Sequence, residues 1–151
     1  MSVCTFLAAD YELPTFAPSQ DYSFHVNVDD GTIYDGGAND NYFLIEFKEV
    51  DLYTDKDYGV YLEWDYTDGR ANNILNYIKD ALQNTDSVEL WHVWLMDYYD
   101  FEESPVIFSS TISIDDLTIY DIKEINNAPI FNHPDERYPD RPSFYCLKIV
   151  R

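Results

Sequence analysis

Glycine, basic residues and cysteine are all scarce in this chain, and each scarcity argues against a class of function. Five glycines in 151 residues leave little room for a glycine-rich phosphate-binding loop, and the sequence contains no such motif. Nine lysines and arginines face 29 acids, so the net charge of −20 opposes direct binding of nucleic acid or of an anionic membrane. The two cysteines are too few for the disulfide framework of a small secreted protein.

Cys4 and Cys146 lie in apolar runs at opposite ends of the chain. We expect both to be reduced and buried; a disulfide between them would require the first and last strands to pair. No apolar run approaches the roughly 20 residues of a membrane helix, and the first residues lack the basic region of a signal peptide. The sequence therefore predicts a cytoplasmic protein without membrane contact.

Apolar residues make up 46% of the chain and aromatic residues 17%, which distinguishes it from acidic disordered proteins. Its length suits one domain, which we expect to span residues 1–151. Two helices and a larger number of strands follow from the apolar periodicity. The strands are expected at 3–8, 22–28, 32–34, 42–47, 59–66, 88–96, 106–114 and 143–150, and the helices at 69–83 and 118–126.

The strands outnumber the helices and do not alternate with them. This order predicts an α+β fold, with a mainly antiparallel sheet and one or two helices packed on one face. Residues 88–96 are apolar at both alternating sets of positions, which is typical of a central strand. In residues 42–47 we expect Phe43, Ile45 and Phe47 to point inward. Arg70 is expected on the outer face of the first helix.

Metal and cofactor sites are not indicated. The three histidines and two cysteines lack the paired spacing of zinc ligands, and a lone strand histidine such as His92 is expected to be a hydrogen-bonded structural group. Aspartate and asparagine crowd residues 29–41, and Asp55 and Asp57 follow in 51–59. Neither stretch has the ligand spacing of a known calcium loop, and we therefore predict no metal site. The alternative is that the aspartate-rich residues 29–41 bind a cation.

A carboxylate pair for hydrolysis could be drawn from Glu63, Asp65, Glu89 or Asp97. With 29 acids in the chain such pairs arise by chance, and no nucleophile motif is present, so we expect a protein that is not an enzyme. The alternative is a ligand-binding or hydrolytic domain that gathers Glu63, Asp65 or His92 on a concave face of the sheet.

Many of the 14 tyrosines stand beside acids, as in Asp10-Tyr11-Glu12, Asp57-Tyr58 and Asp65-Tyr66. Residues 1–110 carry 22 acids and 4 bases, a net charge of −18, whereas residues 111–151 carry only −2. Aromatic anchors surrounded by carboxylates suit the surface of a basic protein. We therefore predict a small acidic binding protein, of the kind that inhibits a toxin or a nucleic-acid-binding protein; the alternative is that the charge serves only solubility.

The stretch 97–103 follows the central strand and combines aromatic and acidic side chains most densely. Its predicted partner-binding residues are Asp97, Tyr98, Tyr99, Asp100, Phe101, Glu102 and Glu103. The alternative for its aromatic residues is a structural one, in which they cover an edge of the core while the carboxylates keep the sheet from aggregating.

Overall fold

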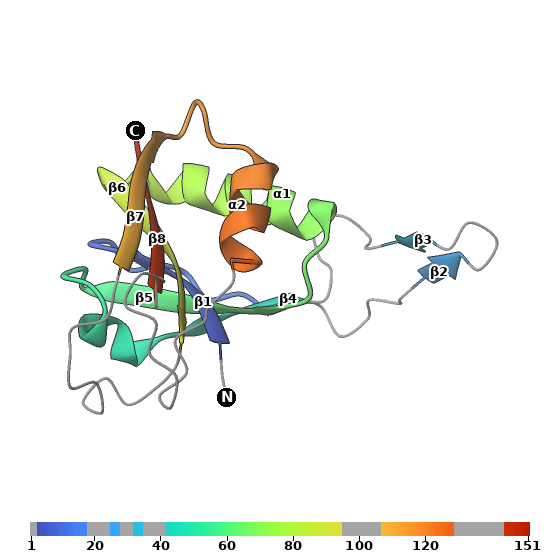
Figure 1. Ribbon diagram of the computed structural model, residues 1–151, viewed down its shortest axis with the longest axis horizontal. Coiled ribbons are helices and arrows are strands. Elements are labelled where there is room, and N and C mark those ends of the chain that lie inside the picture. Colours follow the sequence, from blue (N-terminus) through green and yellow to red (C-terminus); the bar gives the residue numbers. More distant parts are fainter. Residues whose placement is uncertain (1–2, 18–24, 28–31, 35–41, 95–106, 129–143) are drawn as a thin grey trace.

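A six-stranded sheet organises the part of the chain that the computed structural model describes, residues 3–17, 25–27, 32–34, 42–94, 107–128 and 144–151 (Figure 1). Its strands are β1 (Val3–Ala9), β4 (Tyr42–Glu46), β5 (Tyr58–Trp64), β6 (Ser87–Trp94), β7 (Ile107–Ser113) and β8 (Phe144–Val150). They lie in the order β4-β5-β1-β6-β8-β7. Every neighbouring pair is antiparallel except β7 and β8, which are parallel. With two helices beside this sheet, the predicted α+β class is confirmed.

Two short strands form a separate hairpin. β2 (His25–Asn27) pairs antiparallel with β3 (Thr32–Tyr34), as the alternation of the sequence predicts. Figure 1 draws this pair apart from the main sheet. The residues between them, 28–31, lie outside the described residues.

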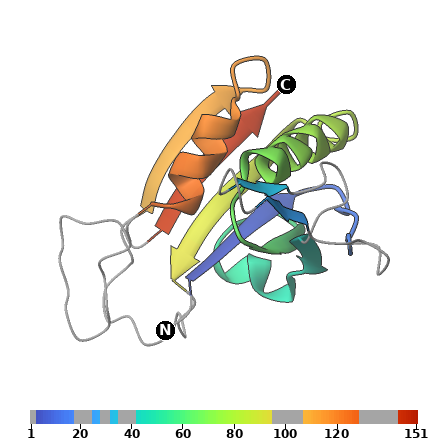
Figure 2. The same ribbon diagram turned by 90° about the vertical axis from the view of Figure 1, so that its right-hand side faces the viewer.

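Both helices, α1 (Asp68–Ala81) and α2 (Ile119–Asn126), cover the same face of the sheet (Figure 2). α1 begins where predicted, because the Thr67 hydroxyl caps it by accepting a hydrogen bond from the Arg70 backbone N–H at 3.1 Å. The apolar stripe of each helix packs on the inward side chains of the strands. Their shared core includes Leu7, Val60, Leu62, Ile74, Ile78, Val88, Leu90, Ile122 and Ile149. Among the described residues no helix combines the length and the apolarity needed to cross a bilayer.

The opposite face of the sheet carries a second, aromatic core beneath a short 3-10 helix, η1 (Lys48–Leu52), which the sequence did not predict. Phe6 lies at its centre, with ring centroids 4.7 Å from Phe47 and 5.9 Å from Trp91. Phe47 is buried, as expected. Leu44, however, is the most buried side chain of its segment and faces the helices instead. A sheet covered on both faces has two inward directions, which the pattern of one strand cannot separate.

The central position predicted for residues 88–96 is confirmed, because β6 lies between β1 and β8. Leu90 faces the helices while Trp91 and Val93 face the aromatic core. β6 packs against a core on each of its faces, which explains why apolar side chains occur at successive positions of this strand.

Arg70 corrects one expectation: the prediction that it lies on the outer face of its helix is wrong. It is only 4% exposed, and its guanidinium donates a hydrogen bond to the carbonyl oxygen of Asp65 at 2.6 Å. The first turn of α1 lies against the end of β5, and five N–H donors allow an arginine to be buried at such a junction.

Cys4 and Cys146 are free and buried in the aromatic core, as predicted. Their strands do not pair, because β6 separates β1 from β8. Two strand spacings of about 4.8 Å already exceed the roughly 7 Å limit between Cα atoms of a disulfide. Burial raises the pKa of each thiol to about 12, so neither is a reactive thiolate near neutral pH.

Candidate functional site

The predicted partner-binding stretch, residues 97–103, lies outside the described residues, and so does most of the aspartate-rich stretch 29–41. The described part of the chain nevertheless gathers carboxylates elsewhere, through the topology of the sheet.

One end of the sheet collects acids from five strands. β1 and β4 end there, and β5 and β6 begin there, as the pairs Ala9↔Tyr58 and Ala9↔Val88 show. β7 and β8 end on the same side, where Val150 pairs with both Ser87 and Ser113. Figure 1 shows these strand ends following one another along one side of the sheet. Exposed acids stand within a few residues of these ends: Asp10, Glu12, Glu46, Asp57, Asp86, Asp115 and Asp116. We call these seven residues the acidic end.

Basic residues partly balance the acidic end. Lys56 forms an ion pair with Asp10 at 3.1 Å and also donates a hydrogen bond to the Ser87 hydroxyl at 3.0 Å. Arg151 forms an ion pair with Asp86. Lys48, at the start of η1, is the third base in this region. These three bases therefore balance only part of the charge of the seven acids.

A cleft of about 880 Å³ opens within the acidic end. One wall is the segment 11–15, which leaves β1 and crosses to the outer edge of the sheet. It is anchored by buried Leu13 and by Phe16, whose backbone exchanges two 3.0 Å hydrogen bonds with Leu44 of β4. The facing wall is formed by residues 46–48, Val50 of η1 and residues 57–59.

The cleft combines carboxylates with tyrosine. Glu12, Glu46 and Asp57 are exposed, and none of them takes part in an ion pair within the described residues. Tyr58, on the same wall as Asp57, is 44% exposed. Carboxylates beside an aromatic ring can bind a lysine or arginine side chain through both charge and ring contact.

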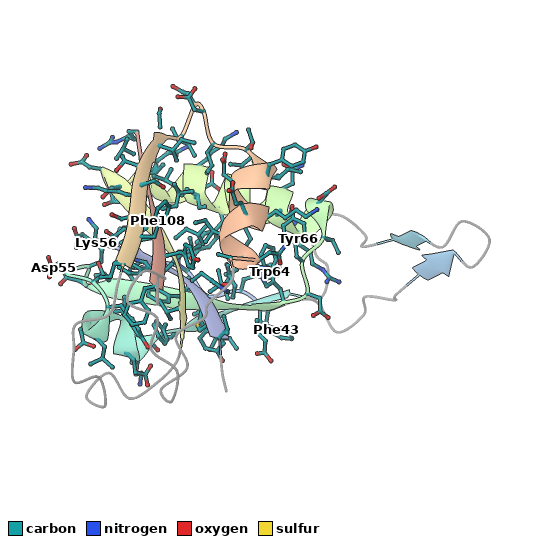
Figure 3. All side chains as sticks on the ribbon, viewed as in Figure 1. Phe43, Asp55, Lys56, Trp64, Tyr66 and Phe108 are labelled. Atoms are coloured by element: carbon teal, nitrogen blue, oxygen red, sulfur yellow. The ribbon has the colours of Figure 1, made fainter. Side chains whose placement is uncertain are left out.

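Two of the aromatic–acid pairs singled out in the sequence meet in this cleft. Tyr11-Glu12 and Asp57-Tyr58 come from opposite walls. The third pair, Asp65-Tyr66, lies beyond the other end of β5. There the Tyr66 hydroxyl donates to the Asp68 carboxylate at 3.2 Å, and Figure 3 shows Tyr66 near Trp64, far from Asp55 and Lys56. The register of the sheet, which the sequence does not reveal, decides which of these pairs line the cleft.

Residues considered for carboxylate chemistry are not brought together. Leu62, Thr5 and His92 share one row on the helix-covered face, so Glu63 points to the other face, and Asp65 lies beyond the end of β5. The 880 Å³ cleft and the smaller ones of 360 and 240 Å³ are not lined by Glu63, Asp65 or His92.

Glu89 has a structural environment. Its carboxylate accepts hydrogen bonds from the Thr54 hydroxyl at 2.5 Å and from the Trp91 indole at 3.1 Å. His92 is likewise buried and hydrogen-bonded, as predicted, with Nδ1 2.8 Å from the Thr5 hydroxyl. Within the described residues, no three histidine, cysteine or acidic side chains gather as a metal site would require.

No protein-family model matches the chain, and neither a curated protein nor a solved structure matches it significantly.

Proposed function

We propose that this protein is a binding module for a basic protein, such as a toxin or a nucleic-acid-binding protein, whose activity it inhibits by covering a basic surface. The acidic end carries this proposal. Five strands deliver carboxylates to one end of the sheet, and the cleft among them holds three that make no ion pair within the described residues.

The composition supports a role for this charge in recognition. A net charge of −20 attracts a basic protein over distances comparable to the Debye length, about 10 Å at 0.1 M salt and about 3 Å at 1 M. Steering therefore brings the partner close, and the cleft supplies short-range contacts to its lysine and arginine side chains. The stretch 97–103 remains a second candidate contact region in this proposal.

The experiment begins with the protein immobilised and native lysate passed over it at low and at high salt. A partner retained at low salt is then purified, and its association rate is measured against three variants. Glu46→Lys with Asp57→Lys alters the cleft, and Asp97→Lys with Asp100→Lys alters the predicted stretch. Glu63→Lys with Asp65→Lys is the matched control at the far end of β5. Each variant makes the net charge less negative by the same amount.

We expect the cleft variant to associate more slowly with the partner and to dissociate faster, so that its affinity falls at least about tenfold. A tenfold change in affinity corresponds to about 1.4 kcal/mol. The control is expected to show only the smaller, salt-sensitive loss of long-range steering. Equal losses in all three variants would remove the cleft and the stretch as contact sites and leave only bulk charge. Retention of no basic protein at low salt would refute the proposal itself.

A further inference from the structure

β7 is the outermost strand of the main sheet on one side. β7 pairs only with β8 in the described part of the chain, and residues 107–111 are exposed. Two of them are large and apolar: Ile107 is 47% exposed and Phe108 is 60% exposed. An edge strand of this kind presents unpaired backbone N–H and C=O groups to any added strand.

The opposite edge of the sheet is treated differently. There the chain returns after β1, and Phe16 forms a two-hydrogen-bond bridge with Leu44 of β4. Natural edge strands are commonly protected by charge or proline, yet β7 has neither in its seven residues. Within the described residues the two edges of this sheet thus differ: Phe16 bridges β4, whereas β7 has β8 as its one paired neighbour.

A hollow of about 240 Å³ lies beside this edge strand, between β7, β8 and α2. Phe108 and Tyr145 line it with ring centroids 6.1 Å apart, and Ile125 and Leu147 add apolar surface. The Glu124 carboxylate stands on its α2 rim and is exposed. A strand added to β7 would direct alternate side chains toward this hollow.

The charges around β7 indicate which charge an added strand would need to carry. Asp115 and Asp116, both exposed, follow its last residue, and Glu124 flanks the hollow. β7 itself carries no charge, so β7 of a second copy would bring no cation to these acids. Of the nearby bases, Lys123 lies over the Tyr66 ring at 5.7 Å. Lys148 of β8 is the register partner of Thr111 and is exposed, but it alternates with Leu147 and so lies on the face of the sheet opposite the hollow. The surroundings of β7 are therefore complementary to an extended segment with basic residues.

We infer that β7 binds an extended segment of the basic partner as a seventh strand of the sheet. An apolar side chain of that segment would occupy the hollow beside Phe108, and a lysine or arginine would meet Asp115, Asp116 or Glu124. This mode of strand addition obtains affinity from main-chain hydrogen bonds and specificity from alternate side chains. The inference rests on the function proposed above and adds where, and in what conformation, the partner is held.

The test uses the full chain labelled for NMR and two synthetic peptides. The first is Lys-Val-Thr-Phe-Thr-Val-Lys, and the second replaces both lysines with glutamate. At low salt, the basic peptide is expected to shift and protect the backbone amides of residues 107–113, and the acidic peptide is expected to leave them unchanged.

Two pairs of variants separate the contributions. Phe108→Ser should weaken the basic peptide roughly tenfold, whereas Tyr120→Ser, which removes an aromatic ring 72% exposed on α2, should not. Asp115→Lys with Asp116→Lys should weaken it more than Glu46→Lys with Asp57→Lys, which changes the net charge equally at the cleft. A Phe108→Ser protein that has lost its fold would be recognised by its amide spectrum, and the aspartate pair would then decide.

The possible results are distinct. Binding of the basic peptide at residues 46 and 57 without change at β7 would overturn the strand-addition site while leaving the proposed function intact. Equal binding of the acidic peptide would overturn the charge selection. Concentration-dependent shifts of β7 without any peptide, with a dimer in sedimentation, would assign the edge to a second copy of this chain. No binding of either peptide at low salt would also reject the inference.

Discussion

A buried chain of hydrogen bonds joins the helix-covered face of the sheet to the end of α2. The Thr5 hydroxyl donates to the Asn126 side-chain oxygen at 3.2 Å and lies within hydrogen-bond distance of His92 Nδ1, at 2.8 Å. The Trp64 indole donates to the same Asn126 oxygen at 3.1 Å. Burial lowers the pKa of His92, although a hydrogen bond with the Ala128 backbone opposes this shift.

We expect this histidine to make the protein less stable in mild acid. Because its folded pKa lies below the unfolded value, the unfolded chain takes up the proton first. The contribution of His92 is therefore full above pH 6.5 and is lost as the pH falls through the folded pKa. Urea unfolding of the wild type and of His92→Asn should show a difference in unfolding free energy that narrows from pH 7.5 to pH 5. A constant difference would contradict this account.

Gly59 is fixed by close packing. A Cβ atom at this position would lie 3.0 Å from Val50 Cβ and Cγ2 and 3.3 Å from the carbonyl oxygen of Leu7. Gly59→Ala is expected to cost about 1–3 kcal/mol of unfolding free energy, the usual range for overpacking. Val50→Ala on the same chain should recover part of that loss, because it removes Cγ2, one of the two nearest atoms, and leaves a smaller side chain opposite the new methyl group. Additive losses in the double variant would exclude this contact as the cause.

At the scale of elements, the helices and strands follow from local patterns. Apolar periodicity predicts both helices, and side-chain caps fix where they begin: Thr67 caps α1, and Thr118 with Asp121 forms a capping box at α2. The Asp121 carboxylate accepts hydrogen bonds from the Thr118 backbone N–H at 2.8 Å and from the Thr118 hydroxyl at 3.0 Å. η1 was not predicted, because it is held by contacts of Val50 and Phe47 with strands distant in sequence.

The cap of α2 supports one expectation about this element. Asp121→Ala should lower the unfolding free energy by about 1 kcal/mol, because it leaves the Thr118 N–H without its carboxylate acceptor. Glu124→Ala removes the same charge from the exposed surface of the same helix and should have a smaller effect. Thermal or urea unfolding of the two variants provides the comparison, and equal effects would mean that charge alone matters.

At the scale of the whole molecule, the described residues present an acidic end and an uncharged edge strand. Both arise from the order β4-β5-β1-β6-β8-β7, which aligns the strand ends and leaves β7 outermost. The two surfaces adjoin, since Asp115 and Asp116 belong to the acidic end and also follow β7. One partner could thus engage carboxylates and strand edge together.

Self-repulsion of a molecule with a net charge of −20 leads to an expectation about salt. Sodium chloride raised from 0.02 to 0.5 M should increase the unfolding free energy, because screening weakens repulsion among the carboxylates. Glu46→Lys with Asp57→Lys should be more stable than the wild type at low salt and should respond less to added salt. A fall in stability with salt would show that the attractive pairs, such as Lys56–Asp10, outweigh the repulsion.

The sequence by itself determined the class of the fold, most of its elements, the central place of β6 and the buried state of His92 and the cysteines. These depend on periodicity, capping and burial preference, which act over a few residues. Only the tertiary structure decided that Tyr11-Glu12 and Asp57-Tyr58 share a cleft while Asp65-Tyr66 does not, that Arg70 is buried, and that β7 is an exposed edge. Those outcomes depend on strand order and register, which are set by contacts between residues far apart in the chain.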